Sequence, residues 1–363
     1  MKVLFLTNVP SPYRVDFFNA LGSMCDLTVL YQKRSSSERD TKWTQKIGEH
    51  YQSVFLQGVS TKADQALCLE VVHYLKRGRY DRIVICGNSS PTEMLAIEWC
   101  RMMRIPYCLE GDGGFAKDGK GLKEKIKAHF IRGAQMYLST GKTLDAYFET
   151  YGAQRERIVR YPFTSVKEAD LLREPVSGEE KQQLRMRLGM SEQNIVLSIG
   201  QFIPRKGFDL LLEAWQGMPK DAGLYIVGGE PTQEYLNMVH TYGLQNVHFI
   251  GFQNKDVVTA YYRAADVFVL PTREDIWGLV VNEAMSNGLP VVTTDRCAAG
   301  LELIRDGVNG YLVSTEDVPA LAKALASVLG DETCRRQMGK AALCTMQGYT
   351  IEEMVRAHMR LLA

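Results

Sequence analysis

One segment constrains the fold of this chain more than any other: residues 267–295 predict a strand, an acidic loop, a helix and a second strand, in that order. Val267–Leu270 is a short apolar run without a polar break, which is typical of a buried parallel strand. From Gly278 onward the apolar residues follow helical spacing, until an Asn-Gly pair and a proline end the helix at residues 287–290. Val291–Thr294 is the second strand. This βαβ unit predicts a parallel α/β sheet.

Three acidic residues belong to this unit. Glu274 and Asp275 follow the first strand at its carboxyl end, where open α/β sheets bind ligands, and Glu283 comes about two helical turns later. Asp275 and Glu283 would lie about 12 Å apart along an ideal helix. They are therefore too far apart to share one proton, but they can contact two parts of one long ligand. Gly278 lets a ligand approach the backbone and leaves the first helix amides free for an anion. The alternative is a solvated helix start with acids that complement its dipole.

Strands and helices alternate along the rest of the chain, which predicts two Rossmann-like α/β domains. Regular periodicity stops near residue 162, so the expected domains are residues 1–165 and 166–349. The first domain has predicted strands over residues 2–6, 27–31, 51–56, 82–86, 105–109 and 136–139, and predicted helices over 62–79, from 91, over 120–133 and over 141–151.

Composition excludes several classes of protein. The 363 residues include 43 basic and 42 acidic side chains, so no overall field favours nucleic acid as a partner. The eight cysteines form no Cys-x-x-Cys pair, which predicts reduced thiols and no zinc site. The first apolar run is too short for a signal segment and no run is long enough to span a bilayer, so the expected location is the cytoplasm.

Polar residues also follow strands of the first domain. Arg14 begins a helix after the first strand, where a cation opposes the helix dipole, and this favours a functional role. Asn88 precedes a helix and can either cap it or hold a sugar hydroxyl. Glu110 and Asp112 stand among three glycines, a composition that indicates a ligand pressed close to the backbone.

Residues 120–133 predict a basic helix with an apolar stripe. Five cations surround this stripe, Lys120, Lys123, Lys125, Lys127 and Arg132. The helix is either an ordinary surface helix or a patch that meets anionic lipid head groups.

In the second domain, residues 200–207 join a strand end to a helix start. Arg205 and Lys206 are adjacent cations between Gly200 and Gly207, and they predict a cradle for a diphosphate. The loop at residues 295–300 and its helix are a second place where free amides could meet a phosphate.

The chain resembles the retaining glycosyltransferases of the GT-B fold, family 4 type. Asp275, Glu283 and the following Gly-Leu-Pro-Val-Val match the acid-x7-acid signature of that family, although the first acid is usually Glu and the adjacent Glu274 could take its role. The resemblance implies that the first acid contacts the donor sugar and that Glu283 contacts the ribose. Lys206 matches the family's basic pair, and Arg205 would replace the other member, where this chain has Gln201.

The resemblance also places the remaining site residues. It implies donor contacts at Gly200, Gly229, Phe252, Gly278 and Leu279. In the family a His commonly stands where this chain has Glu110 and Asp112, so Asp112 is the expected catalytic residue of the first domain, with Arg14, Glu110 and Asn88 on the acceptor side. The final helix, residues 350–363, is expected to return to the first domain.

These features predict a retaining glycosyltransferase that moves a sugar from a nucleoside-diphosphate sugar to a saccharide or lipid-linked saccharide in cell-surface polysaccharide synthesis. No cofactor and no metal are expected, since Lys206 and helix termini offset the charge of the diphosphate. An anionic membrane at the inner face of the plasma membrane is a further expected partner. Two alternatives stay open: a sugar-nucleotide epimerase of the same fold, and an inactive nucleotide-sugar-binding protein.

Overall fold

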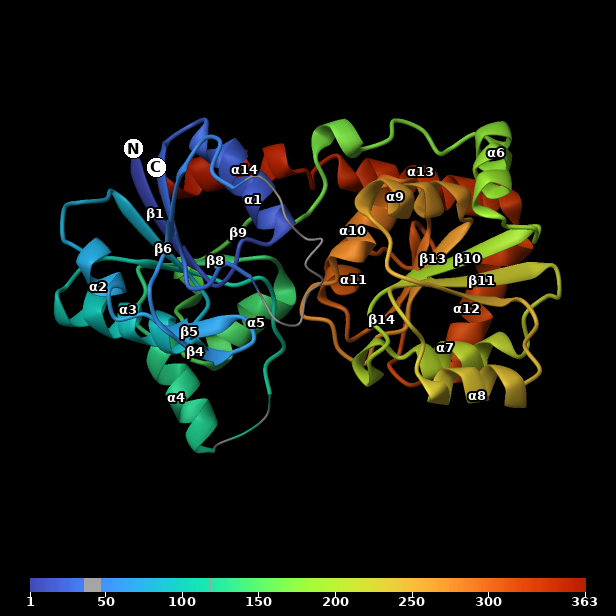
Figure 1. Ribbon diagram of the computed structural model, residues 1–363, viewed down its shortest axis with the longest axis horizontal. Coiled ribbons are helices and arrows are strands. Elements are labelled where there is room, and N and C mark those ends of the chain that lie inside the picture. Colours follow the sequence, from blue (N-terminus) through green and yellow to red (C-terminus); the bar gives the residue numbers. More distant parts are fainter. Residues whose placement is uncertain (36–46, 118, 120) are drawn as a thin grey trace. The chain divides into compact units, whose positions relative to one another are not determined.

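The computed structural model describes residues 1–35, 47–117, 119 and 121–363 (Figure 1). It divides into two compact units, Met1–Ser165 with Thr350–Ala363, and Val166–Tyr349. These bounds coincide with the expected domains. That the first domain binds the acceptor and the second binds the nucleotide-sugar stays a prediction.

The first unit is built on a seven-stranded sheet with the order β3-β2-β1-β6-β7-β8-β9, in which every pair of neighbours is parallel. Its strands are β1 (Lys2–Thr7), β2 (Asp26–Tyr31), β3 (Gln52–Phe55), β6 (Arg82–Cys86), β7 (Cys108–Glu110), β8 (Met136–Ser139) and β9 (Ile158–Arg160). Its α-helices are α1 (Pro12–Gly22), α2 (Val71–Tyr74), α3 (Pro91–Met102), α4 (Leu122–Ile131), α5 (Lys142–Thr150) and α14 (Ile351–Leu362).

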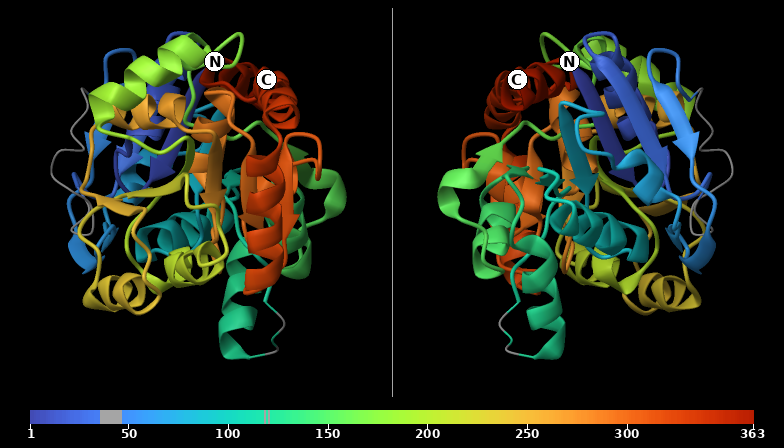
Figure 2. Two further views of the ribbon diagram at one scale, coloured as in Figure 1. Left: turned by 90° about the vertical axis from the view of Figure 1, so that its right-hand side faces the viewer. Right: turned by 90° about the vertical axis from the view of Figure 1, so that its left-hand side faces the viewer.

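Helices cover both faces of this sheet. Apolar runs such as Val3–Leu6 need this cover, because their side chains point to both faces and all are buried. In Figure 1, α1 and α14 lie on one face, and α3 and α5 lie on the other. Helix α4 projects away from the sheet in Figures 1 and 2. Among the described residues, no helix is long and apolar enough to cross a membrane.

The return of the final helix follows from its sequence. Thr350 caps the N-terminus of α14 by accepting a hydrogen bond of 3.2 Å from the Glu353 amide. One face of the helix is apolar and buried, and the helix packs against α1 in the first unit. Its buried residues are Ile351, Met354, Val355, Ala357, His358 and Leu362.

The helix expected over residues 62–79 is wrong. The segment forms an antiparallel pair, β4 (Val59–Lys62) and β5 (Gln65–Leu67), followed only by the short α2. Side chains from elsewhere satisfy this backbone: the Cys68 amide donates to the Thr92 hydroxyl at 2.9 Å, and that hydroxyl donates to the Ala66 carbonyl at 2.6 Å. Tertiary hydrogen bonds thus override a helical spacing of apolar residues. Strand β9, absent from the expected strands, closes the other edge of the main sheet. In the basic helix, Lys120 lies outside the described residues.

The second unit is a six-stranded parallel sheet with the order β12-β11-β10-β13-β14-β15. Its strands are β10 (Asn194–Ile199), β11 (Ala222–Val227), β12 (Val247–Ile250), β13 (Val267–Leu270), β14 (Val291–Thr294) and β15 (Gly310–Val313). Its α-helices are α6 (Gly178–Leu188), α7 (Phe208–Trp215), α8 (Gln233–Thr241), α9 (Lys255–Ala264), α10 (Leu279–Ser286), α11 (Ala298–Leu303), α12 (Val318–Gly330) and α13 (Glu332–Met346). If the six strands are numbered in chain order, the order of the strands across the sheet is 3-2-1-4-5-6, which is the order in a dinucleotide-binding Rossmann sheet. The prediction of two Rossmann-like α/β domains is confirmed.

Candidate functional site

The second unit brings its predicted site residues to one point of its sheet. Strands β10 and β13 are neighbours, yet the chain leaves β10 toward β11 and leaves β13 toward β14. The two loops therefore diverge at the carboxyl ends of the strands, and such a switch point is where Rossmann-like sheets bind ligands. Lys206 lies on the first loop and Asp275 on the second.

An ion pair joins these two loops. The Lys206 ammonium donates a hydrogen bond of 2.7 Å to Asp275 Oδ2, and the Arg205 guanidinium lies 3.7 Å from the same oxygen. The side chain of Lys206 runs across Gly200, where an added Cβ would come within 3.3 Å of its Cε. Both partners of the ion pair are largely buried, with side chains 12% and 11% exposed. Two cations therefore share one carboxylate, which leaves a net positive charge for an anionic ligand.

Gly207 allows the loops to approach this closely. Its φ of 69° is left-handed, and an added Cβ would lie 2.1 Å from the Pro271 carbonyl oxygen. The Arg205 carbonyl then accepts hydrogen bonds of 2.8 Å from the Arg273 amide and from the Thr272 hydroxyl. These bonds fix the backbone that carries Arg205 and Lys206.

The two candidates for the first acid have different partners. Glu274 accepts a hydrogen bond of 2.6 Å from Arg296, whereas Asp275 pairs with Lys206. The Glu274 carbonyl accepts a further bond of 2.7 Å from Arg205. Asp275 is thus the acid that adjoins the loop from β10.

Helix α10 begins at Gly278, whose φ of 98° would strain any other residue. The Val281 amide donates to the Gly278 carbonyl, whereas the amides of Leu279 and Val280 have no partner within the described part of the chain. Glu283, on the same helix, accepts a hydrogen bond of 3.1 Å from the buried Tyr262 hydroxyl. The helix start is therefore open to an anion, and Glu283 is held in place.

The expected phosphate contact at residues 295–300 is wrong. The Ala298 and Ala299 amides donate to the carbonyls of Asp275 and Trp277 at 3.1 and 2.8 Å. These amides hold the acidic loop instead of a ligand. The sequence offered no sign that a second backbone segment would occupy them.

Gly229 and Phe252 follow the carboxyl ends of β11 and β12. Apart from the chain neighbours of Gly229, no atom of the described residues lies within 4 Å of a Cβ added there, and Phe252 is 39% exposed. Both positions are accessible at the same edge as Lys206, as their predicted donor contacts require.

In the first unit, the candidates Arg14, Glu110 and Asp112 form one network, of which Arg14 and Glu110 are buried. The Arg14 guanidinium donates to Glu110 at 2.8 Å and also to Asp112. Glu110 is fully buried and accepts a further bond of 2.7 Å from Tyr161. Burial alone would raise the pKa of Glu110, but the charge of Arg14 and the neighbouring His358 outweigh it and hold the pKa well below the ordinary 4.5. Glu110 is therefore placed to hold Arg14 and not to touch a ligand.

Asp112 is the accessible end of this network. Its side chain is 32% exposed and accepts a hydrogen bond of 2.8 Å from Tyr13. Burial and Asp112 together raise the pKa of Tyr13 well above its usual value, so the phenol stays a hydrogen-bond donor. Of the three predicted residues, Asp112 is the one that can meet an acceptor hydroxyl.

His358 joins this network from the end of the chain. The ring is fully buried, its Nδ1 donates to the Met354 carbonyl at 2.8 Å, and its Nε2 lies 3.8 Å from Glu110. Helix α14 thus brings a buried imidazole next to Glu110, although no histidine stands near Glu110 in the sequence. Sequence reasoning missed His358, although its place on the apolar face of a terminal helix was a usable signal.

Asn88 follows β6, and the residues beside it cap α3. Ser90 and Glu93 form a capping box, and Glu93 also accepts a hydrogen bond of 2.9 Å from the Ser89 amide. Local capping therefore accounts for the Ser-Ser pair. Among the described residues, no group of three metal-ligating side chains comes together.

Residues 180–343, which contain Lys206, Asp275 and Glu283, match the family model of the glycosyl transferases group 1. The second unit carries a glycosyl transferases group 1 domain. The ion pair and the open helix start therefore lie in the part of the chain that matches this family model.

Two relatives illustrate the similarity of this group 1 domain. An uncharacterized glycosyltransferase of Haemophilus influenzae is 31% identical over 47% of this chain and 49% of its own length. The lipopolysaccharide core biosynthesis glycosyltransferase LpsE of Rhizobium meliloti is also 31% identical, again over 47% of this chain and 49% of its own length. The matched part of the chain thus spans about half the length of these relatives.

The likeness of fold extends through both units. The crystal structure of Anabaena Alr3699/HepE in complex with UDP has a TM-score of 0.80 and covers 99% of both chains, at 18% identity. The fold is therefore that of the GT-B glycosyltransferases, as predicted.

Proposed function

We propose that this protein transfers a sugar from a nucleoside-diphosphate sugar to a hydroxyl of a saccharide acceptor, with retention of the anomeric configuration. The observation that carries the proposal is the Lys206–Asp275 ion pair at the switch point of a group 1 domain. The pair provides a cation for the departing diphosphate and a carboxylate for the sugar.

The donor would lie along the carboxyl edge of the second unit. Lys206, Arg205 and the amides of Leu279 and Val280 would hold the diphosphate, since all present N–H donors at one edge of the sheet. Asp275 would accept hydrogen bonds from the sugar, and Glu283 from the ribose. Support for this class of donor comes from HepE, whose structures contain UDP and UDP-glucose.

The reaction would exchange one bond at the sugar's anomeric carbon. The bond from this carbon to the diphosphate oxygen breaks while the acceptor oxygen bonds to the same face, and the acceptor proton passes to the departing phosphate. Lys206 would lower the barrier because negative charge develops on the diphosphate as it leaves. The cations and helix amides would supply this stabilisation without a metal.

The acceptor would meet the first unit through Asp112 and Tyr13, the accessible part of the Arg14 network. We further propose that the acceptor is a lipid-linked saccharide of a cell-surface polysaccharide. Helix α4 supports this: Leu122 and Ile126 of its apolar stripe are 74% and 41% exposed, so they do not serve the core.

The test uses the whole protein with UDP-, GDP- and ADP-linked sugars. A donor at 100 times its dissociation constant stabilises the folded state by about 2.7 kcal/mol, so thermal shifts identify the base and sugar. Turnover of that donor to a product with the same anomeric configuration, read by NMR, supports the proposal. Conversion of the donor to its epimer without an acceptor would assign the epimerase. Binding without hydrolysis or transfer would assign the inactive binding protein.

A further inference from the structure

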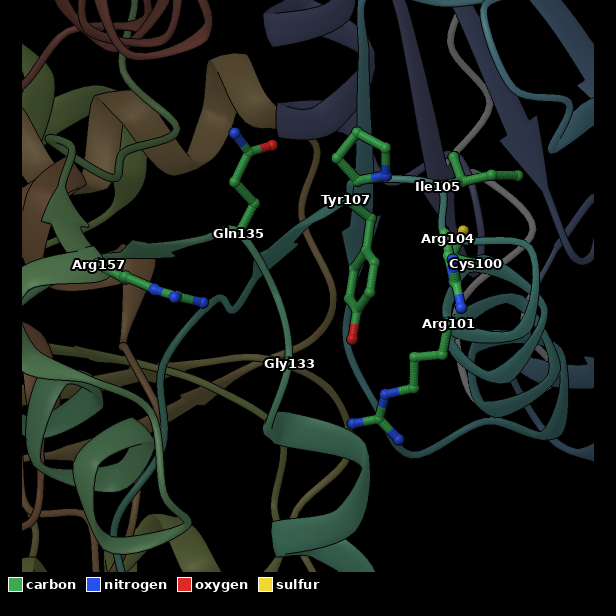
Figure 3. Close-up of a pocket in the computed structure, with 9 residues that line it drawn as sticks. Cys100, Arg101, Arg104, Ile105, Tyr107, Gly133, Gln135 and Arg157 are labelled. Carbon is green, nitrogen blue, oxygen red and sulfur yellow. The ribbon is translucent and has the colours of Figure 1, made fainter.

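A pocket of about 510 Å³ lies in the first unit, at the edge of the sheet opposite to Glu110 and Asp112 (Figure 3). Its residues come from the segments that lead into three neighbouring parallel strands, with Tyr107 just before β7, Gln135 before β8 and Arg157 before β9. The end of α3 completes it. This is the amino edge of the strands, so the pocket is separate from the proposed acceptor site.

Three arginines line this pocket, and none of its nine described lining residues is acidic. Arg101 is compensated, because it donates to Glu98 at 2.7 Å and to the carbonyls of His129 and Arg132. Arg157 donates to the Ala134 carbonyl at 3.3 Å, and the Arg104 side chain has no partner within the described part of the chain. Both residues are exposed, so the pocket presents two positive charges without a counterion among the described residues.

Arg104 occupies a position that favours glycine. It follows α3 with a φ of 53°, and the Ile105 amide donates back to the Cys100 carbonyl at 2.8 Å, which is the hydrogen bond of a Schellman C-cap. Only glycine adopts this conformation without steric cost. The chain thus keeps a guanidinium at the pocket where the local backbone would prefer no side chain.

Further donors face the same space. The Tyr107 side chain is 3% exposed, and its hydroxyl has no hydrogen-bond partner of normal geometry among the described residues. An added Cβ at Gly133 would come within 3.4 Å of Arg101 Nε and 3.8 Å of the Tyr107 hydroxyl, so the missing side chain keeps both atoms open. Figure 3 shows Tyr107 between Arg157 on one side and Arg101 and Arg104 on the other.

We propose that this pocket binds a phosphate group, with Arg104 and Arg157 as its charged ligands and Tyr107 and Arg101 Nε as further donors. Guanidinium groups match the geometry of phosphate oxygens, and the lining offers no carboxylate to repel them. Two sources share this chemistry: a soluble phosphate ester and the head group of an anionic lipid. Met102 and Met103 beside Arg104 are 66% and 48% exposed, and this apolar rim is suited to a lipid.

The first experiment follows modification of each arginine by phenylglyoxal, resolved by mass spectrometry, in inorganic phosphate or in chloride of equal ionic strength. We expect phosphate to slow modification of Arg104 and Arg157 at least about threefold and to leave the exposed Arg77 unchanged. This readout is local, so phosphate bound near Lys206 does not affect it.

The second experiment measures sedimentation with vesicles of phosphatidic acid or of phosphatidylcholine. The variant combines Arg104→Gly, which suits the left-handed backbone and should not lower the melting temperature, with Arg157→Gln. The control combines Lys76→Gln with Arg77→Gln and so removes the same charge from exposed positions of the same unit. For a lipid ligand we expect only the first variant to lose at least about tenfold in binding to phosphatidic acid, as expected for one lost charged hydrogen bond.

Protection by phosphate without vesicle binding through the pocket would assign a soluble ester as the ligand. Vesicle binding that depends on Arg104 and Arg157 would assign a lipid head group. Equal modification rates in both salts, together with equal vesicle binding by the variant and its control, would overturn the site. Neither experiment measures sugar transfer, so a failure of the phosphate site can be distinguished from a failure of the proposed activity.

Discussion

The ammonium of Lys206 lies 2.7 Å from Asp275 Oδ2 and joins two loops that leave neighbouring strands in opposite directions. In the free protein the carboxylate holds the lysine in place, so the diphosphate of the proposed donor would meet a cation that needs little reorganisation.

Replacement of Lys206 by Ala should lower kcat and kcat/KM together by about 100-fold, because the charge it stabilises is greatest in the transition state. Steady-state kinetics with the identified donor checks this. The exposed Lys220, changed to Ala, is the matched control. A rise in KM alone would show that Lys206 binds ground state and transition state equally.

Asp275→Asn and Glu274→Gln should separate the two candidates for the first acid. Asp275 adjoins Lys206, whereas Glu274 is bound to Arg296, so we expect loss of at least about 100-fold in kcat for the first variant and less than about tenfold for the second. The same transfer assay measures both. The reverse order would give the role to Glu274.

Glu283→Gln should weaken nucleoside-diphosphate binding by about 1.5–3 kcal/mol, since a charged acceptor of the ribose hydroxyls becomes neutral. Calorimetry with the free nucleotide measures the change. Tyr262→Phe removes the hydroxyl that donates to Glu283 at 3.1 Å and lies 3.4 Å from the Val280 carbonyl, but keeps the charge of Glu283, and it should cost less. Unchanged affinity in Glu283→Gln would remove this residue from the site.

Glu110→Gln should destabilise the protein by about 3–5 kcal/mol at neutral pH, because Arg14 is left buried without its full counterion. The pKa of Glu110 is lowered in the folded state, so the unfolded chain takes up the proton first as the pH falls. The stabilisation is therefore complete above pH 4.5 and is lost below it.

Urea denaturation at several pH values checks this prediction. The difference in the free energy of unfolding between wild type and Glu110→Gln should be constant from pH 5 to 8 and should shrink below pH 4.5. Glu149→Gln breaks the exposed pair with Arg155 and should cost less than about 1 kcal/mol. A difference that does not vary with pH would mean that Glu110 carries no special charge stabilisation.

Charge reversal on α4 should release the protein from anionic vesicles while donor hydrolysis continues. Lys123 and Lys125 are exposed, whereas Lys127 lies 5.3 Å from the centre of the Tyr151 ring and is left unchanged. Each surface cation near an anionic membrane contributes about 1 kcal/mol, so the double Glu variant should bind far more weakly and the binding should fall with salt. Vesicle binding that ignores both changes would favour a soluble acceptor.

The sequence was sufficient for the repeating fold and for the ligand edge of the second unit. Strand β13, helix α10 and strand β14 follow directly from apolar runs and an Asn-Gly end signal, and Lys206 and Asp275 were found because both follow strands. A parallel sheet then brings such residues to one edge by geometry alone.

Contacts between distant segments could not be predicted in this way. Thr92 satisfies the backbone of Ala66 and Cys68, which changes an expected helix into a strand pair. His358 reaches Glu110 across most of the chain. In both cases the deciding partner lies far away in sequence, where local periodicity carries no information.

The place of α14 in the first unit has a consequence for biosynthesis. Phe17 lies against His358, with ring centres 4.7 Å apart, but a ribosome makes all of Val166–Tyr349 between them. At about 5–20 residues per second this takes roughly 10–40 s. During that interval the nascent first unit lacks part of its cover over α1, and its exposed aromatic side chains are a natural target for chaperones.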